Sequence, residues 1–262
     1  MEKGNNRKME RMRKPLQGII NIIRFNWHFY VLSFVMVVSL FLLSQFVIEP
    51  FRFVANMLNW LIVLVTLISL LVSFYVYDLS GLYHLKWLDN LPIKANSKIA
   101  NINAGFDETS ELLQHKFPHA ELHVYDFYDP FKHTEISIKR ARKAYPPYPN
   151  TIVVNTDYLP IADNQLDVIF LILSAHEIRQ LPEQNIFFTE LERALNQNGI
   201  IIVTEHTRDL PNFLAYNIGF FHFFSTSSWH SVFKNARLDV KKQIKITPFI
   251  TTYILTKNGT TA

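Results

Sequence analysis

Two long stretches near the start of the chain are apolar on every side. Residues 26–48 and 54–77 contain no Asp, Glu, Lys or Arg, whereas a long core helix of a soluble protein almost always has a polar side. A helix of about 23 residues is roughly 35 Å long, which is enough to cross the ~30 Å hydrocarbon core of a bilayer. We therefore expect two transmembrane helices, and the lipid bilayer as the partner of residues 26–77.

The charges around these stretches predict their orientation. Residues 1–25 hold seven Lys or Arg against two Glu, whereas the short connection 49–53 holds one basic residue, Arg52. Because basic segments stay on the cytoplasmic side, residues 1–25 are predicted to be a cytoplasmic tail. Two crossings then return the chain to the cytoplasm before residue 78. A cleaved signal peptide is the alternative, but the first apolar run is too long for one and a second run follows directly.

From residue 78 onwards, helix-like and strand-like patterns alternate. Residues 80–91 are amphipathic and predict a linker helix within 78–97, which Pro92 would end. Further helices are expected over 109–116, 134–144 and 184–195, and strands over 98–102, 122–126, 151–155, 166–173, 200–205, 240–246 and 250–257. This alternation predicts an α/β domain over 98–257, with a doubly wound sheet and a C-terminal antiparallel hairpin.

Composition narrows the classes of function. The chain has no cysteine, which excludes disulfides, thiolate nucleophiles and Cys-ligated metals. Outside the basic tail the remaining residues have a net charge of −1. A nucleic-acid-binding domain needs a basic patch, so no nucleic-acid partner is expected.

Residues 98–126 form the most informative stretch. A buried strand leads into a tight loop around Gly105, then into a helix and a second strand that ends in Asp126. This is half of a nucleotide-binding βαβ unit, in which an acidic residue about 20 positions beyond the loop holds a ribose diol. The stretch predicts that the domain binds a ligand of the nucleoside type.

The order of motifs resembles the class I S-adenosylmethionine-dependent methyltransferases over about residues 94–257. The resemblance rests on four segments in the family's order and spacing: IANINAGFDETSELL (99–113), ELHVYDFYDP (121–130), TDYLPIADNQLDVIFLILSAHEI (156–178) and LERALNQNGIIIVTEH (191–206). It implies a Rossmann-like methyltransferase sheet, S-adenosylmethionine as the cofactor and a small-molecule methyl acceptor.

The loop departs from the family pattern at three positions. Asn101 stands where the family usually has an acid, and Asn103 and Asp107 replace glycines. Asn tolerates a positive φ, so Asn103 can keep the turn. A carboxylate at Asp107 would repel a pyrophosphate at the helix N-terminus, whereas S-adenosylmethionine has no phosphate and bears an ammonium and a sulfonium. This residue favours the methyl donor over NAD or ATP.

The resemblance also implies roles by position. Gly105 would let the backbone approach the methionine part of the cofactor, Asp126 would bind the ribose, and Asp157 would face the adenine. The complete set of expected cofactor-binding residues is Asn101, Asn103, Gly105, Asp107, Asp126, Phe127, Asp157, Tyr158 and Ser174.

Three titratable residues are candidates for a catalytic base. His176, Glu205 and His206 follow the C-terminal ends of the fourth and fifth strands, where ligands bind in such sheets. For each of them, a structural role as a polar residue at a strand end is favoured over a catalytic one. Ten histidines also raise the question of a metal, but there is no Cys and no recognised ligand spacing, so no metal site is expected.

The aromatic segment 212–224 bears on the acceptor. It is either a core helix or the lining of an acceptor pocket, and as a lining it would select an apolar acceptor. A membrane anchor also favours a substrate that partitions into lipid. The chain is therefore predicted to be a membrane-anchored methyltransferase. A non-catalytic S-adenosylmethionine-binding or scaffold protein is the alternative, and Asp107 and the missing glycines disfavour a nucleotide-dependent oxidoreductase.

Overall fold

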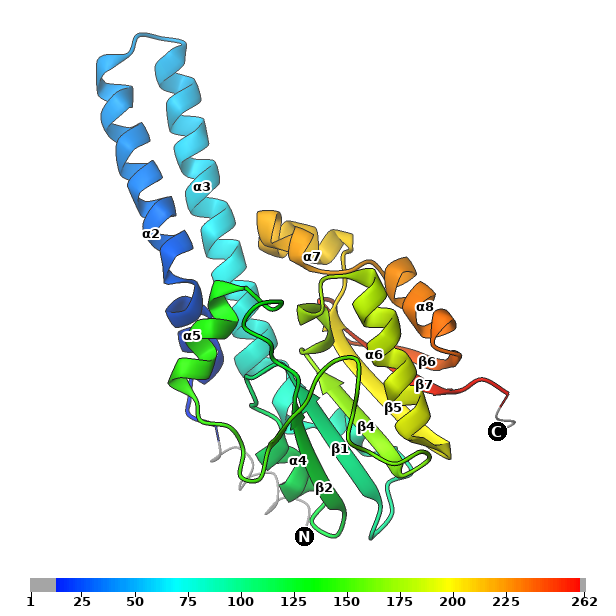
Figure 1. Cartoon of the computed structure of the whole chain (residues 1–262). Coiled ribbons are helices and arrows are strands. Elements are labelled where there is room, and N and C mark those ends of the chain that lie inside the picture. The colour runs from blue at the N-terminus through cyan, green and yellow to red at the C-terminus, as the bar shows by residue number, and fades with distance from the viewer. Residues whose placement is uncertain (1–12, 260–262) are drawn as a thin grey trace.

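The computed structural model describes residues 13–259, which form a seven-stranded sheet and a helical hairpin (Figure 1). The strand order is β3-β2-β1-β4-β5-β7-β6, and β7 is antiparallel to both of its neighbours. The predicted doubly wound sheet with a C-terminal antiparallel hairpin is confirmed. The strands are β1 Lys98–Asn103, β2 Glu121–Asp126, β3 Ile152–Val153, β4 Leu166–Ile172, β5 Leu195–His206, β6 Leu238–Thr247 and β7 Ile250–Lys257.

Helices cover both faces of the sheet. On one face, α6 (Leu181–Ala194) and α8 (Thr226–Asn235) bury Phe188 and Trp229 in the larger core cluster. On the other face, α4 (Ser110–Lys116) buries Leu113 against the strands. Because β1, β4 and β5 are covered on both faces, their sequences are nearly continuous apolar runs. Two more helices, α5 (Ile136–Ala144) and α7 (Leu210–Tyr216), lie towards the hairpin (Figure 1).

The hairpin consists of α2 (Gln17–Phe46) and α3 (Phe51–Phe74), and α3 continues into a π-helical turn at Tyr75–Leu79. Both helices are long and apolar enough to cross a membrane. In the most apolar 18-residue segment of each helix, only 6% of the residues are buried within the protein. The helix α2 begins before the predicted span and is kinked at Asn26. The predicted start of the first span therefore coincides with a break in the helix.

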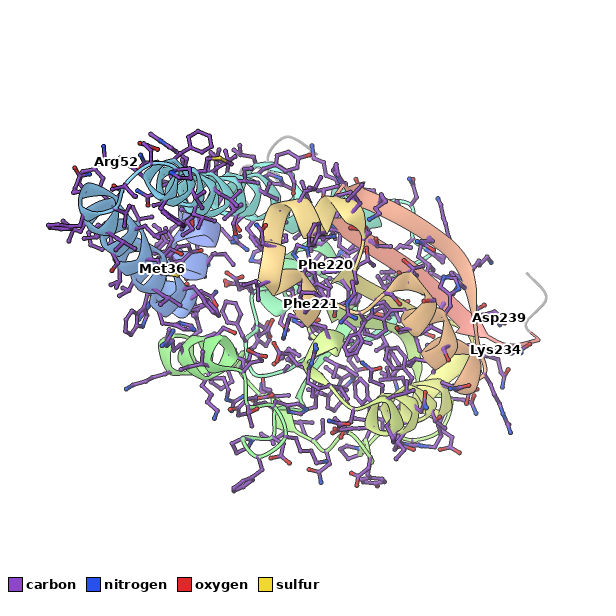
Figure 2. The ribbon with its side chains drawn as sticks, turned by 90° about the horizontal axis from the view of Figure 1, so that it is seen from above. Met36, Arg52, Phe220, Phe221, Lys234 and Asp239 are labelled. Carbon is purple, nitrogen blue, oxygen red and sulfur yellow. The ribbon has the colours of Figure 1, made fainter. Side chains whose placement is uncertain are left out.

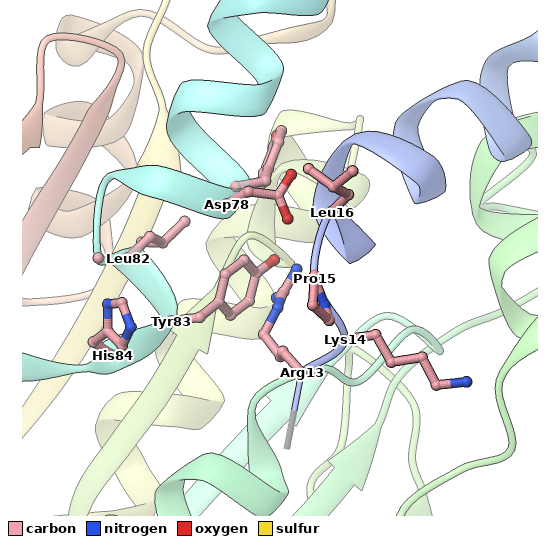
Figure 3. A pocket seen from close by; sticks show the side chains of 10 residues that line it. Arg13, Lys14, Pro15, Leu16, Asp78, Leu82, Tyr83 and His84 are labelled. Carbon is pink, nitrogen blue, oxygen red and sulfur yellow. The ribbon is translucent and has the colours of Figure 1, made fainter. Parts of the chain in front are cut away.

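Asp78 joins the two helices at their base. Its carboxylate accepts hydrogen bonds from the backbone amides of Gly18 and Ile19, both at 2.8 Å. These amides belong to the first turn of α2 and would otherwise lack partners. A Cβ on Gly18 would overlap with Tyr77, so glycine is required for this close approach. Figure 3 shows the pocket at this base, where Arg13 lies over the ring of Tyr83 at 3.4 Å from its centroid.

The predicted linker helix over 80–91 is wrong. Two short 3-10 turns, Leu82–His84 and Lys86–Leu88, take its place. Gly81 and Leu85 both have positive φ values, 79° and 54°, which a continuous helix does not allow. The apolar periodicity instead serves the core, because Leu85 and Leu88 are buried against the sheet.

Other boundaries shifted. The third strand is reduced to Ile152–Val153, and β5 begins at Leu195, before the start of the predicted strand over 200–205. The segment between β5 and β6 contains two helices, α7 and α8, joined by a 3-10 turn, Asn217–His222.

Candidate active site

The carboxyl ends of the parallel strands bring most of the predicted site residues to one edge of the sheet. Asn103 and Asp126 are opposite each other in the register of β1 and β2. His176 follows β4, and Glu205 and His206 end β5. The hairpin base touches the same edge, because the Tyr77 hydroxyl lies 2.8 Å from Nε2 of His206.

The loop after β1 turns at Gly105, which has a φ of 86°. Asn103 does not adopt a positive φ, so the conformational reason given for it above is wrong. It stays in the extended strand and stabilises the turn through its side chain, whose Oδ1 accepts a hydrogen bond from the Gly105 amide at 2.8 Å. The side chain thus replaces a glycine by bonding to the backbone, as Asn commonly does in turns.

Asp107 caps the following helix. Its Oδ1 accepts hydrogen bonds from the amides of Thr109 and Ser110 at 3.0 and 2.9 Å, as expected for an acid at a helix N-terminus. Buried Asn101 donates its side-chain amide to the hydroxyls of the same two residues at 2.9 and 2.8 Å. Asn101, expected to contact the cofactor, therefore holds the shape of the loop with its amide nitrogen.

Arg142 of α5 fills the position expected for the ribose. Its Nη1 donates to Oδ2 of Asp126 at 2.5 Å, and its guanidinium carbon lies 4.3 Å above the ring of Tyr128. A Cβ on Gly105 would overlap with the same guanidinium. No sequence signal distinguishes Arg142 from the other basic residues of a charged surface helix, so the sequence did not predict this contact.

Glu108 ties the loop to the hairpin base. Its carboxylate accepts hydrogen bonds from Gln17 Nε2 at 3.0 Å, Asn21 Nδ2 at 3.2 Å and the Tyr83 hydroxyl at 2.9 Å. Arg13 Nη1 lies 3.5 Å from it. The loop that the sequence identified as the cofactor loop is therefore fixed to the segments that enter and leave the hairpin.

The remaining predicted cofactor residues fall into two groups. Phe127 and Ser174 are buried, the first against Phe187 at a ring distance of 5.1 Å and the second with its hydroxyl donating to the Ile102 carbonyl at 2.9 Å. Asp157 and Tyr158 are exposed in the turn after β3. The structure thus places Phe127 and Ser174 in the framework of the domain.

His176 lies between two carboxylates. Its Nδ1 is 2.7 Å from Oε2 of Glu205, and its Nε2 is 3.5 Å from Oε1 of Glu177. Burial by itself lowers the pKa of His176, but the charge of Glu205 and the hydrogen bond to Glu177 outweigh it and raise the pKa above its ordinary value. In this arrangement both ring nitrogens of His176 face carboxylates, so His176 does not act as a free base.

His206 is held neutral. Desolvation by burial lowers its pKa to about 4. Its Nδ1 is 3.0 Å from Oδ1 of Asn212, and its ring stacks on Phe223 at 4.7 Å. Since both ring nitrogens have partners, His206 connects β5 to the hairpin and to α7. Of the three predicted bases, none has a free basic nitrogen or oxygen outside these contacts.

His222 joins the group at the end of β4 and was not predicted. The ring of His222 lies 5.0 Å from the ring of His176 at 81°, and one ligand atom each from His176, Glu177 and His222 lie within 4.8 Å of one another. His222 could not be predicted, because it follows Glu177 by 45 positions and lies in an aromatic segment without a recognised metal-binding spacing.

The loop residues fit S-adenosylmethionine. Nδ2 of Asn103 and Oδ2 of Asp107 are buried, and no hydrogen-bond partner for either exists among residues 13–259. A buried donor and a buried acceptor without partners are unfavourable. The amide nitrogen of Asn103 can donate a hydrogen bond to the carboxylate of the methionine part of the cofactor, and the carboxylate of Asp107 can accept one from its ammonium. Asp126 can accept hydrogen bonds from ribose hydroxyls once Arg142 is displaced.

Comparisons with known proteins agree with this geometry. The family model described as "Methyltransferase domain" matches residues 104–203, and no curated protein matches the chain. Among solved structures, the geranyl diphosphate C-methyltransferase from Streptomyces coelicolor A3(2) is 10% identical. The match covers 71% of this chain and 82% of that one, with a TM-score of 0.50.

A putative type 11 methyltransferase from Sulfolobus solfataricus is 16% identical, with 68% of this chain and 95% of that one covered at a TM-score of 0.45. At 10% identity and a TM-score of 0.50, the Streptomyces structure speaks only to the fold, which is Rossmann-like. The family model supports S-adenosylmethionine as the cofactor. The resemblance inferred from the sequence is therefore confirmed: residues 104–203 match a methyltransferase domain model, and the structural neighbours are class I, S-adenosylmethionine-dependent methyltransferases.

Proposed function

We propose that this protein is a membrane-anchored methyltransferase that transfers the methyl group of S-adenosylmethionine to a small apolar or lipid-like acceptor. In this proposal α2 and α3 cross the bilayer, and the tail 1–25 and the catalytic domain lie on the cytoplasmic side. The support for the anchor is the length and apolarity of the two helices and their low burial within the protein.

One observation carries the proposal: the carboxyl edge of the sheet adjoins the hairpin base. Tyr77 contacts His206 at the end of β5, and Gln17 contacts Glu108 in the cofactor loop. These contacts fall on both halves of the edge. An acceptor that reaches the methyl group there approaches from the side of the membrane surface.

The aromatic segment after β5 supports an apolar acceptor. It does not form a core helix, because several of its apolar side chains are exposed, among them Phe213, Ile218 and Phe221 at 44%, 84% and 62%. The segment lies beside α3 (Figure 1), and Figure 2 shows Phe220 and Phe221 at its surface. Exposed apolar residues of this kind mark an interaction surface, and beside a membrane helix the fitting partner is the lipid interface.

The residues at the end of β4 and β5 suit methyl transfer. Bound S-adenosylmethionine supplies an electrophilic methyl group. Burial raises the pKa of Glu177, but hydrogen bonding to His176 outweighs it and lowers the pKa below its ordinary value, so this residue favours its carboxylate form. Glu205 holds the His176 ring with hydrogen bonds at 3.2 Å to its amide and 2.7 Å to its Nδ1. Much of the rate would come from positioning the acceptor against the methyl group.

A second candidate function is a non-catalytic S-adenosylmethionine-binding or scaffold protein. Arg142 favours it, because this side chain occupies Asp126 and the approach to Gly105. A cofactor has to displace an ion pair of a largely buried carboxylate.

Calorimetry on the full chain in detergent micelles separates these functions. The methyltransferase is expected to bind S-adenosylmethionine and S-adenosylhomocysteine at micromolar concentrations, with no binding of NAD. Asp126→Ala should abolish that binding. Asp163→Ala, which removes an exposed carboxylate paired with Arg193, is the matched control. Absence of binding by the unaltered chain contradicts both candidate functions that involve the cofactor.

The same preparation tests catalysis. Radiolabelled methyl groups should pass from S-adenosylmethionine to the lipid fraction of a membrane extract and not to its water-soluble fraction. Binding without transfer to either fraction favours the non-catalytic function, and transfer only to soluble metabolites contradicts the lipid-like acceptor.

The orientation can be tested by single cysteines, because the chain has none of its own. Glu49→Cys in the exposed connection between α2 and α3 should react with a membrane-impermeant maleimide in intact cells, and Lys234→Cys on α8 only after lysis. The reverse pattern contradicts a cytoplasmic domain.

A further inference from the structure

The group of side chains at the end of β4 has the composition of a metal site. His176 and Glu177 belong to the 3-10 turn after β4, and His222 ends the turn that follows α7. One nitrogen or oxygen from each lies within 4.8 Å of the other two. Two imidazoles and one carboxylate are a common ligand set for first-row divalent cations.

The His176 ring is already held as a ligand. Its Nδ1 pairs with Glu205 at 2.7 Å, which is the carboxylate support that metal-bound histidines usually have, and which leaves Nε2 for a cation. That Nε2 lies 3.5 Å from Oε1 of Glu177. Two ligands each about 2.1 Å from a tetrahedral cation are roughly 3.4 Å apart, so these atoms need little movement.

His222 has equivalent support. Its Nδ1 lies 3.3 Å from Oε1 of Glu135. Arg179 donates from Nη1 to the backbone carbonyls of His176 at 3.1 Å and His222 at 2.5 Å. The two segments that supply the histidines, which are far apart in the sequence, are therefore joined by one guanidinium.

A second observation points to a ligand that is a cation. Oε2 of Glu177 is buried, the residue is 6% exposed, and none of residues 13–259 provides that oxygen with a hydrogen bond. Three carboxylates, Glu135, Glu177 and Glu205, face the two imidazoles and Arg179. A buried acceptor oxygen without a donor is unfavourable, and protonation of His176 does not satisfy it. A divalent cation would.

We propose that His176, Glu177 and His222 bind one divalent transition-metal cation. The side chains of His176 and His222 are 14% and 26% exposed, so a cation and a further ligand can reach them from solvent. The site lies between the ends of β4 and β5. If the proposed function holds, this cation binds an oxygen of the methyl acceptor and acts as a Lewis acid.

Cobalt(II) is the probe, because its visible absorption reports on coordination. The tag-free full chain is treated with EDTA and titrated with Co²⁺ in detergent micelles. One Co²⁺ per chain with visible bands, displaced by Zn²⁺, is the expected result. Glu177→Gln and His222→Gln should each weaken binding by about 100-fold. His230→Gln, an exposed histidine on α8, should not change it.

Binding that persists in the Glu177→Gln/His222→Gln double variant, or no binding by the unaltered chain, overturns the proposal. Thermal unfolding shows whether the variants are folded. If Glu177→Gln is unstable, the His222→Gln variant, at a half-buried position, replaces it in the test. Calorimetry with S-adenosylhomocysteine on the same samples separates the two proposals. Cofactor binding without Co²⁺ binding overturns the metal site alone, and the opposite result overturns the proposed function alone.

Discussion

The two halves of the carboxyl edge are built in opposite ways. At the ends of β1 and β2, the acidic groups are paired with side chains from elsewhere: Asp126 with Arg142, and Glu108 with the hairpin base. At the ends of β4 and β5, Glu205 and His176 pair with each other, deep in the domain. The half at β1 and β2 therefore depends on α5 and the hairpin for the partners of its acidic groups, whereas the central pair of the half at β4 and β5 lies within that half, which contacts the hairpin and α5 through Tyr77 and Glu135.

The hairpin also reaches the half at β1 and β2 through α5. Arg140 donates to the Phe25 carbonyl at 2.6 Å and lies 2.8 Å from Nδ1 of His28. Arg142, two positions later, holds Asp126. A change in the position of α2 would thus act on the loop after β1 by two routes, and on the ends of β4 and β5 through Tyr77, through α7 and through the pair of Glu135 with His222 at the start of α5.

The largest expected effect is on the free energy of unfolding, for a change at the ends of β4 and β5. Glu205→Ala removes the buried carboxylate that accepts a hydrogen bond from the backbone amide of His176 and pairs with its Nδ1, and breaking such a buried pair costs about 3–5 kcal/mol of unfolding free energy. The thermal unfolding midpoint should fall by roughly 10 °C. Asp126→Ala should cost less, because Arg142 is 35% exposed and can turn to water. Equal losses in the two variants would contradict the comparison.

The next effect concerns pH and His206. Its folded-state pKa of about 4 lies below the unfolded value of 6.5, so the unfolded chain binds more protons between these values. Stability is therefore full above pH 6.5 and falls towards pH 4, by roughly 3 kcal/mol at most. Unfolding midpoints at a series of pH values measure this slope. His206→Gln should flatten it, and an unchanged slope assigns the effect to another group.

A smaller effect, on the affinity for the cofactor, is expected from the contact that α5 makes with Asp126. Arg142→Ala removes the side chain that competes with the cofactor for Asp126, so S-adenosylhomocysteine should bind about tenfold more tightly, which corresponds to ~1.4 kcal/mol. Lys143→Ala, at the next and exposed position, is the control. If Arg142→Ala weakens binding instead, this arginine is a cofactor ligand and not a competitor.

The smallest effect on stability is expected at Glu108, which connects the loop after β1 to the base of the hairpin. Glu108→Gln retains the size of the side chain but loses the charge that accepts several hydrogen bonds, at a cost of about 1 kcal/mol. Amide hydrogen exchange over residues 104–110 should become faster, while the β4 and β5 ends keep their protection. Glu111→Gln, exposed in α4, should leave the exchange unchanged.

The sheet could be predicted from the sequence because its strands are buried on both faces and are bounded by turn residues. Leu166–Ile172 and Ile250–Lys257 are examples. The linker failed because Leu85 and Leu88 have the spacing of an amphipathic helix, yet positive φ values at Gly81 and Leu85 bend the chain. Spacing records which residues are buried and does not record the backbone path between them.

Residues of the candidate site could be predicted only where their position at the end of a strand determines their location. Asp126, His176 and Glu205 lie at strand ends, and parallel strands bring their carboxyl ends together. Arg142 and His222 come from connecting segments whose direction depends on packing against α2, α3 and the sheet. Their sequences give no sign that one would cover the cofactor loop and the other would complete a ligand set.

The hydrogen bonds from Gly18 and Ile19 to Asp78 fix the base of the hairpin. They hold the points where the chain enters and leaves the hairpin next to each other. If the hairpin crosses a bilayer as proposed, these hydrogen bonds and not a flexible tether set the distance between the sheet edge and the lipid surface. Under the proposed function, an acceptor would then have to bring its reactive atom to the level of the headgroups, which would select molecules whose methylated group is at the polar end of an otherwise apolar body.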